Sequence, residues 1–344
     1  MKSIKTYLFL LVSFTTLYSY AQYTEVINSN RPGVSRSAFS VGTNVVQFEV
    51  GPYILNENHN LLNREDKSFG TDFAVRYGLL FPQLEINVEG TFQSTNRSYT
   101  GIVANDETFS NFKTLTVGAK YLVYDPYKNA GEDKPDLRSW KANHSFKWNQ
   151  LIPAVAVYAG ANFDAKDNPF TAAEIEGFSP KVMVGTQNNF ASGWVLVTNF
   201  ILDRIGTDQS DFSFILTLTK SITDQWVLFG ETQNISSDFY ADNLIRFGGA
   251  YLWSKNFQLD TALTFNTKDT PSVFGVTIGA SYRLDFHKDK EGKDGTSADE
   301  ELERRENKSR GKNKNKREKE DTDFDDGLDS LDWTYCCHCK LDRN

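Results

Sequence analysis

The chain has 344 residues, a formal net charge of −8, 39% hydrophobic residues and 14% aromatic residues. This composition is too polar for a helical membrane protein, and the acidic balance argues against a nucleic-acid partner. The aromatic residues include 26 Phe and 15 Tyr, and transmembrane β-barrels place such residues on the outer face and at the membrane interfaces.

Residues 1–21 have the three parts of a secretory signal peptide. Lys2 and Lys5 supply the positive charge, an apolar stretch follows, and Ser19-Tyr20-Ala21 is a small-x-small cleavage site. The alternative is a membrane anchor, which needs about 20 apolar residues and therefore a longer run than this one. The sequence predicts export, with a periplasmic N-terminal segment over residues 22–40.

Between residues 41 and 286 apolar and polar residues alternate in short segments, separated by breaks rich in Gly, Asn, Asp and Ser. Alternation places successive side chains on opposite faces of a strand. About twelve segments are present, an even number of the kind found in single-chain bacterial barrels. They lie near residues 46–50, 69–79, 84–93, 114–124, 152–163, 180–190, 194–203, 211–219, 226–233, 243–252, 257–266 and 273–286.

A soluble β-sandwich or barrel would show the same alternation along one strand, so other features decide between the two. The last segment ends on Phe286 and resembles the C-terminal signal of outer-membrane proteins. Short breaks alternate with longer ones, as in barrels with short periplasmic turns and long external loops. The connection 125–150 is the exception, and we expect some helix there at the inner interface. We predict an all-β protein, a transmembrane antiparallel barrel surrounded by outer-membrane lipid.

If the apolar face of each segment meets lipid, the polar face lines the lumen of the barrel. The charged residues on that face have both signs. They either pair into a network that plugs the barrel or line a polar path for a solute, and the sequence leaves both alternatives open. The predicted lumen-lining residues are Glu49, Asp72, Arg76, Glu85, Glu89, Lys120, Glu231, Arg246 and Arg283.

Motifs of catalysis are missing from the sequence. It contains no Gly-x-Ser-x-Gly, no P-loop and no dinucleotide fingerprint. The four His residues are scattered, and an isolated His in a loop, such as His59, is usually a solvated surface residue. We therefore predict a protein that is not an enzyme and has no catalytic residues.

The composition changes sharply after residue 286. Residues 287–332 are almost all charged or polar, in acidic, basic and acidic blocks, and such a segment cannot bury enough surface to fold alone. We predict a disordered, charged periplasmic linker. Its basic block is either solvated or contacts anionic lipid, peptidoglycan or other outer-membrane or periplasmic proteins.

The three Cys of the chain lie together near its end, in a Cys/His-rich motif within residues 333–344. Thiolates and imidazoles are ligands of zinc and other transition metals. Neighbouring residues point in different directions, so two or three of them with a partner's ligand would bind an ion more easily than all four. The alternative is one disulfide and one spare thiol in the oxidising periplasm. The candidate metal ligands are Cys336, Cys337, His338 and Cys339.

Several motifs between residues 28 and 286 resemble a family of exported outer-membrane proteins linked to the MetA pathway of phenol degradation, in the form found in Bacteroidota. The resemblance implies a barrel that transports small, aromatic or other hydrophobic solutes. A barrel with a Cys-bearing tail also resembles accessory barrels of multi-protein outer-membrane machines, which implies a structural or assembly subunit with a plugged barrel and a metal-binding tail. The motifs are Asn30-Arg31-Pro32-Gly33, Gly118-Ala119-Lys120-Tyr121, Ser139 to His144, Leu151 to Val155 and Gly160 to Phe163.

Overall fold

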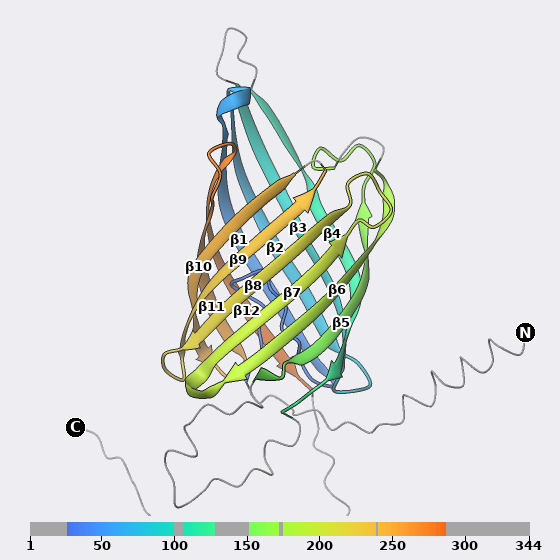
Figure 1. Cartoon of the computed structure of the whole chain (residues 1–344), viewed down its shortest axis with the longest axis vertical. Coiled ribbons are helices and arrows are strands. Elements are labelled where there is room, and N and C mark those ends of the chain that lie inside the picture. The colour runs from blue at the N-terminus through green and yellow to red at the C-terminus, as the bar shows by residue number, and fades with distance from the viewer. Residues whose placement is uncertain (1–25, 100–105, 128–150, 172–174, 239, 287–344) are drawn as a thin grey trace, which may run out of the picture. The chain divides into compact units, whose positions relative to one another are not determined.

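The computed structural model describes residues 26–99, 106–127, 151–171, 175–238 and 240–286. Within them, twelve strands close into one antiparallel barrel in which neighbours in sequence pair and β1 pairs with β12 (Figure 1). This arrangement confirms the predicted fold. The strands are β1 (Val45–His59), β2 (Arg64–Gly78), β3 (Leu84–Tyr99), β4 (Glu107–Tyr124), β5 (Ala154–Asp164), β6 (Gly177–Phe190), β7 (Trp194–Asp203), β8 (Asp211–Ser221), β9 (Trp226–Ser237), β10 (Ala241–Ser254), β11 (Phe257–Asn266) and β12 (Ser272–Asp285).

The connections at one end of the barrel are short, as in the 3-10 turn Ala191–Gly193 between β6 and β7, except for the long connection between β4 and β5. We call this end, where β1 begins and β12 ends, the periplasmic end, because single-chain barrels place their short turns there. The described residues contain no helix long and apolar enough to cross a membrane, a finding that concerns helices alone. The predicted signal peptide, most of the connection 125–150, and the predicted linker and Cys/His motif lie outside the described residues.

The first four strands are longer than the alternation predicts. They contain 15 to 18 residues, whereas β7, β8 and β11 contain 10 or 11. The alternating segments near 46–50 and 69–79 are separated by a long break in the sequence, yet β1 and β2 stay paired through it as far as His59 and Arg64. Outward positions beyond the apolar belt, such as Asn56 and Lys67, are polar, so the alternation disappears from the sequence while the backbone pairing continues.

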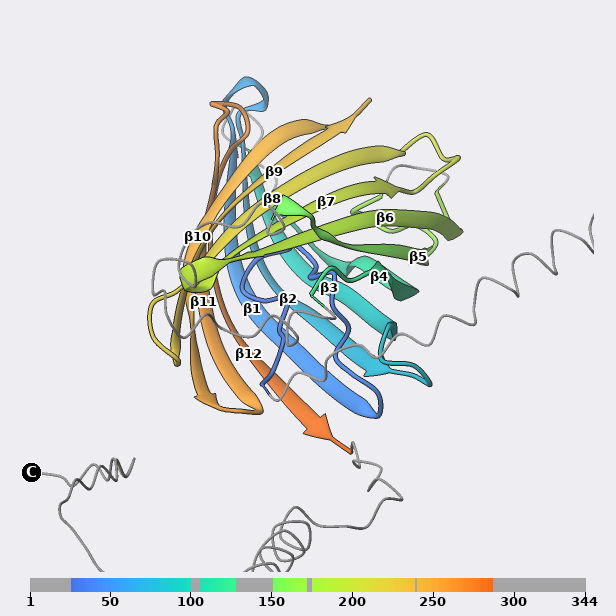
Figure 2. The ribbon, with the colours of Figure 1, turned by 60° about the horizontal axis from the view of Figure 1, so that its bottom comes forward.

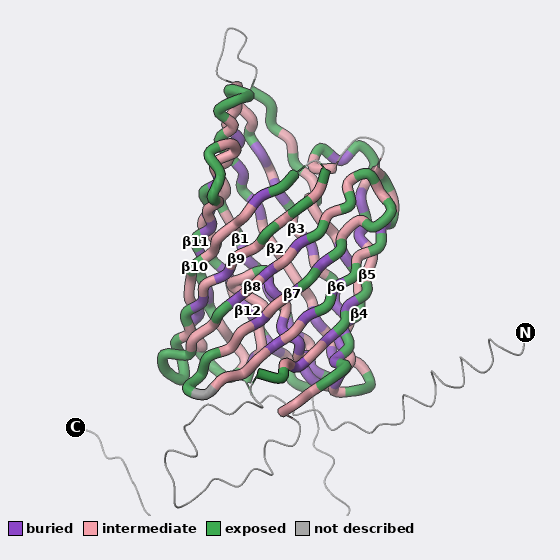
Figure 3. The backbone as a smooth tube through the Cα atoms, in the orientation of Figure 1, coloured by how far each residue is buried: buried purple, intermediate pink, exposed green. Residues whose placement is uncertain are grey.

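Apolar side chains cover the outside of the barrel, and polar side chains point inward. Along β1, Phe48, Val50 and Ile54 are exposed, whereas Gln47 and Glu49 between them are buried. Figure 3 shows the same alternation of buried and exposed positions along the other strands. A closed barrel satisfies all its strand hydrogen bonds, and an apolar exterior matches lipid. The barrel therefore lies in the outer membrane, with lipid against its outer face.

Residues 26–44 lie inside the barrel (Figure 2). The Ile27 amide donates to the carbonyl of Lys255 at the β10–β11 turn (2.9 Å), and the Asn44 amide donates to the carbonyl of Gly78 (2.9 Å). We expected residues 22–40 to form a periplasmic segment, but their described part turns inward, where polar wall residues bind its backbone. We call residues 26–37 the arm and residues 38–41 the base.

Candidate functional site

The first four strands present a buried network of charged residues to the lumen, which we call the charged sector. Arg76 on β2 is 1% exposed and contacts Glu85 on β3 through two bonds of 2.9 Å each. Its third nitrogen contacts Glu49 on β1 at 3.1 Å. Lys120 on β4 lies directly opposite Glu85 in the strand register, and their charged atoms are 3.4 Å apart. The four charges are therefore paired within the wall itself.

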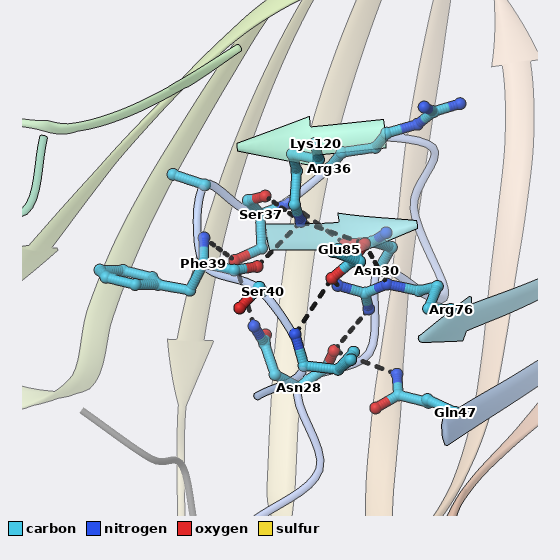
Figure 4. A network of polar contacts seen from close by, with 12 residues as sticks. Asn28, Asn30, Arg36, Ser37, Phe39, Ser40, Gln47, Arg76, Glu85 and Lys120 are labelled. Atoms are coloured by element: carbon cyan, nitrogen blue, oxygen red, sulfur yellow. Dashed lines mark hydrogen bonds and ion pairs between the residues drawn. The ribbon is translucent and has the colours of Figure 1, made fainter. Parts of the chain in front are cut away.

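The remaining hydrogen-bonding capacity of the charged sector is taken by the backbone of residues 26–44 (Figure 4). Arg76 donates to the carbonyl of Asn28 (2.7 Å), and the Val41 amide donates to Glu85 (3.0 Å). Lys120 donates to the carbonyls of Ser37 (2.9 Å) and Phe39 (2.8 Å). Because these bonds involve backbone atoms, the wall recognises the path of the chain more than its side chains.

The opposite wall binds the same segment through one side-chain carboxylate, of Glu231, and two side-chain amides, of Asn199 and Gln187. Glu231 on β9 accepts hydrogen bonds from the amides of Val34 and Ser35, each 3.1 Å long. Asn199 on β7 accepts from the Arg36 amide (2.6 Å) and donates to the Arg36 carbonyl (2.9 Å). Gln187 on β6 accepts from the Ser37 hydroxyl (2.8 Å). The segment is therefore held from both sides and crosses the lumen.

Arg31 in the arm extends its guanidinium to Asp260 on β11, 3.2 Å away. The guanidinium lies against Gly51 and Gly279, where a Cβ atom would overlap it. These two glycines on the neighbouring strands β1 and β12 leave the space that the arginine occupies. The Arg31 carbonyl accepts a hydrogen bond from Gln258 (3.2 Å), so both its backbone and its side chain are bound by the wall.

Arg36 forms the second charged contact of the arm. Its guanidinium pairs with Glu89 on β3 and lies over the ring of Tyr158 on β5, 4.6 Å from the centroid. A cation over an aromatic face gains electrostatic attraction of about 0.5–2 kcal/mol, more when water is excluded. The Arg36 side chain thus joins β3 of the charged sector to β5, the strand next to that sector.

The other predicted lumen residues also lie on inward faces of their strands, away from the Arg76 network. Asp72 accepts a hydrogen bond from Thr91 (2.6 Å). Arg246 on β10 pairs with Glu231 at 3.1 Å, and Arg283 on β12 pairs with Asp285 at 2.7 Å. The structure therefore joins four of the nine predicted residues in one network and places Glu89 and Glu231 against the arm. The other three, Asp72, Arg246 and Arg283, lie outside that network.

Strands β5 to β8 carry a cluster of apolar side chains on their inward faces, beside polar ones such as Asn199, and we call these strands the apolar sector. Its buried cluster consists of Tyr158, Met183, Ile201 and Ile215. A cavity of about 220 Å³ separates the arm from the neighbouring wall, where Val197 and Phe229 contribute to its lining. Gln187 and Gln258 line the same cavity. The lumen therefore contains a space with an apolar side and hydrogen-bonding groups at its edges.

The lumen-lining residues predicted from the sequence are all charged, and they do not include Asp260, Gln187 or Asn199. The sequence does hold a signal for these three residues. Asp260, Gln187 and Asn199 each stand at a polar position of an alternating segment, which indicates that the side chain faces the lumen. Met183 and Ile215 gave no such signal, because they are apolar residues at inward positions with apolar neighbours on both sides in sequence. The predicted metal ligands, Cys336 to Cys339, lie outside the described residues.

The model of one protein family, described as "Putative MetA-pathway of phenol degradation", matches residues 29–284. No curated protein sequence matches the chain. Among solved structures, an outer-membrane channel from Pseudomonas putida F1 is 11% identical with a TM-score of 0.47, covering 75% of this chain and 100% of that one. The NanC porin is 10% identical (TM-score 0.43; 68% and 100% covered), and the KdgM porin is 9% identical (TM-score 0.40; 70% and 99% covered).

Proposed function

Since this chain belongs to the family described as "Putative MetA-pathway of phenol degradation", we propose that it is an outer-membrane channel for small solutes that carry an aromatic or other hydrophobic group. In this proposal the protein is not an enzyme, and the solute crosses the outer membrane through the lumen of the barrel. The observation that carries the proposal is the cavity between the arm and the lumen wall, with Val197 and Phe229 on its apolar side.

The lining of this cavity suits an amphipathic solute better than an ion. Val195, Val197 and Val227 offer apolar contact, and the amide side chains of Gln187 and Gln258 add polar groups to the lining. Small-molecule sites in proteins are commonly apolar with a few well-placed polar groups. The charges of the wall are largely paired with one another, so they provide few free groups for a permeating ion. A small ring with one polar substituent fits this pattern.

Planar-bilayer recordings of the full mature chain test the proposal. We expect stepwise ionic currents that benzoate, an aromatic carboxylate, interrupts for longer than acetate does. Phe229→Ser should shorten the interruptions several-fold because the apolar contact is lost, whereas Thr219→Ser, a change of one methyl group in the same cavity lining, should leave them nearly unchanged. The absence of current at any voltage, together with barrel proteins that co-purify, would instead support the structural-subunit alternative.

We also propose that the tail binds a transition metal such as zinc through Cys336, Cys337, His338 and Cys339 and contacts periplasmic or outer-membrane proteins. The support is the clustering of all three Cys with a His in four consecutive positions. Elemental analysis of protein purified without chelator tests it. We expect near-stoichiometric metal that falls in Cys336→Ser and persists in His59→Ala. A trace amount that Cys336→Ser does not change would rule the metal site out.

A further inference from the structure

We propose that the arm, residues 26–37, leaves the lumen while the base, residues 38–41, stays bound, so that the arm is a reversible plug and the lumen wall is its docking site. The proposal deepens the proposed function, on which its role in opening a path rests. The arm is part of a segment that crosses the lumen between Glu231 and the charged sector. Displacement of this segment would widen the path for a solute.

The contacts that hold the arm are almost all polar. Its backbone binds Arg76, Glu231 and Asn199, and its two arginines bind Asp260 and Glu89. Water can replace each of these partners, so a protein hydrogen bond contributes little net free energy. Of the three large aliphatic side chains in the arm, Ile27 is buried, whereas Val26 and Val34 are 40% and 41% exposed. Little apolar surface therefore resists release.

The base is held in a different way. Ala38 belongs to a buried apolar cluster with Leu122, Ala154 and Ala156, and Phe39 packs against this cluster. The Val41 side chain is 2% exposed. Water cannot replace these apolar contacts, and burial of such side chains stabilises by about 25 cal/mol per Å². The change from polar to apolar anchoring between Ser37 and Ala38 places the boundary of the moving part there.

The wall does not need the arm for its charge balance. Arg76 stays paired with Glu85 and Glu49, and Glu231 stays paired with Arg246, when the arm is absent. Asp260 and Glu89 lose their arginine partners, but the departing arm also uncovers them to water, which removes the main cost of an unpaired charge. The cavity of about 220 Å³ beside the arm gives it space to begin to move.

Cysteine modification tests the movement directly and does not depend on conduction. Ser35 in the arm and Ser40 in the base are a matched pair, since both are buried, with 6% and 7% exposure. Each is changed to Cys in the full chain in which the tail cysteines are replaced by Ser. We expect a polyethylene-glycol maleimide, too wide for the barrel, to modify Ser35→Cys about tenfold faster or more than Ser40→Cys. Equal slow modification of both would overturn the proposal.

A disulfide lock tests whether this movement opens the path. The hydroxyl oxygens of Ser29 and Ser281 on β12 are 2.8 Å apart, so Ser29→Cys with Ser281→Cys is within disulfide reach. We expect no current from the oxidised chain and full current after reduction. Equal currents in both states would overturn the plug. Absence of current in both states, with fast modification of Ser35→Cys, would contradict the proposed channel function but would still support the movement of the arm.

Discussion

The two sides of the lumen wall differ in chemistry and in how they meet the segment that crosses between them. The charged sector is a paired network in which Arg76 alone contacts two carboxylates and the backbone of the arm. Strands β5 to β8 instead present Tyr158, Met183, Ile201 and Ile215. The cavity lies between the arm and the part of the wall that carries Val197 and Phe229. Both sides of the lumen thus bind the chain, but only the side with Val197 and Phe229 leaves space beside it.

This difference separates two tasks within one barrel. Paired charges with spare lone pairs and protons hold a peptide backbone at defined points, because hydrogen bonds have direction and length. Apolar side chains impose no such geometry and can accept any solute of suitable size. A wall with polar groups throughout would bind chain across the whole lumen. A wall with apolar groups throughout would lack the directed contacts that hold a plug.

Removal of the central arginine should have the largest effect. Arg76→Met leaves Glu49 and Glu85 buried beside a single lysine, and we expect the free energy of unfolding to fall by about 3–5 kcal/mol. Denaturant unfolding in detergent micelles, followed by Trp fluorescence, measures it. Adding Glu49→Gln to Arg76→Met should recover part of the loss, since Glu85 keeps its pair with Lys120 whereas Glu49 has lost its ion-pair partner. A loss under about 1 kcal/mol would show that water already reaches the network.

A truncation in the apolar sector should have a smaller effect. Ile215 is 1% exposed and packs with Tyr158, Met183 and Ile201. We expect Ile215→Ala to lower the free energy of unfolding by about 2 kcal/mol, the low end for such a change, because the site adjoins the lumen and can relax. The same unfolding assay measures it. A loss as large as that of Arg76→Met would contradict the view that the charged sector is the more tightly coupled side.

Much of the barrel follows from alternation, because only one residue in two can face lipid. This rule identified the strands and placed Arg76 and Glu85 on the inward face. It could not show that residues 26–37 turn inward. These residues are small and polar without periodicity, a composition that suits a solvated tether equally well. Met183 and Ile215 were missed for a related reason, since the rule assigns apolar residues to lipid and says nothing of an apolar lumen.

A methyl group at a glycine beside the arm should weaken the docking of the arm and leave the barrel intact. Gly51→Ala places a Cβ against the Arg31 guanidinium, and we expect a loss of about 1 kcal/mol from the displaced ion pair. The readout is a several-fold faster modification of Ser35→Cys in the same chain. Gly230→Ala is the matched control, because its nearest contact, the Phe247 side chain, is an ordinary 3.4 Å away. Equal rates for the two alanine variants would contradict the Arg31 contact.

The smallest effect is expected from an ion pair on the same strand as Arg76. Lys67 and Glu65 on β2 are 3.0 Å apart, but their side chains are 60% and 44% exposed. Water and salt screen such a pair, so Lys67→Gln should change the free energy of unfolding by less than about 0.5 kcal/mol. The unfolding assay used for Arg76→Met gives a direct ratio between the two variants. If Lys67→Gln cost as much as Arg76→Met, total charge would matter more than burial, and the contrast between the two sectors would lose its physical basis.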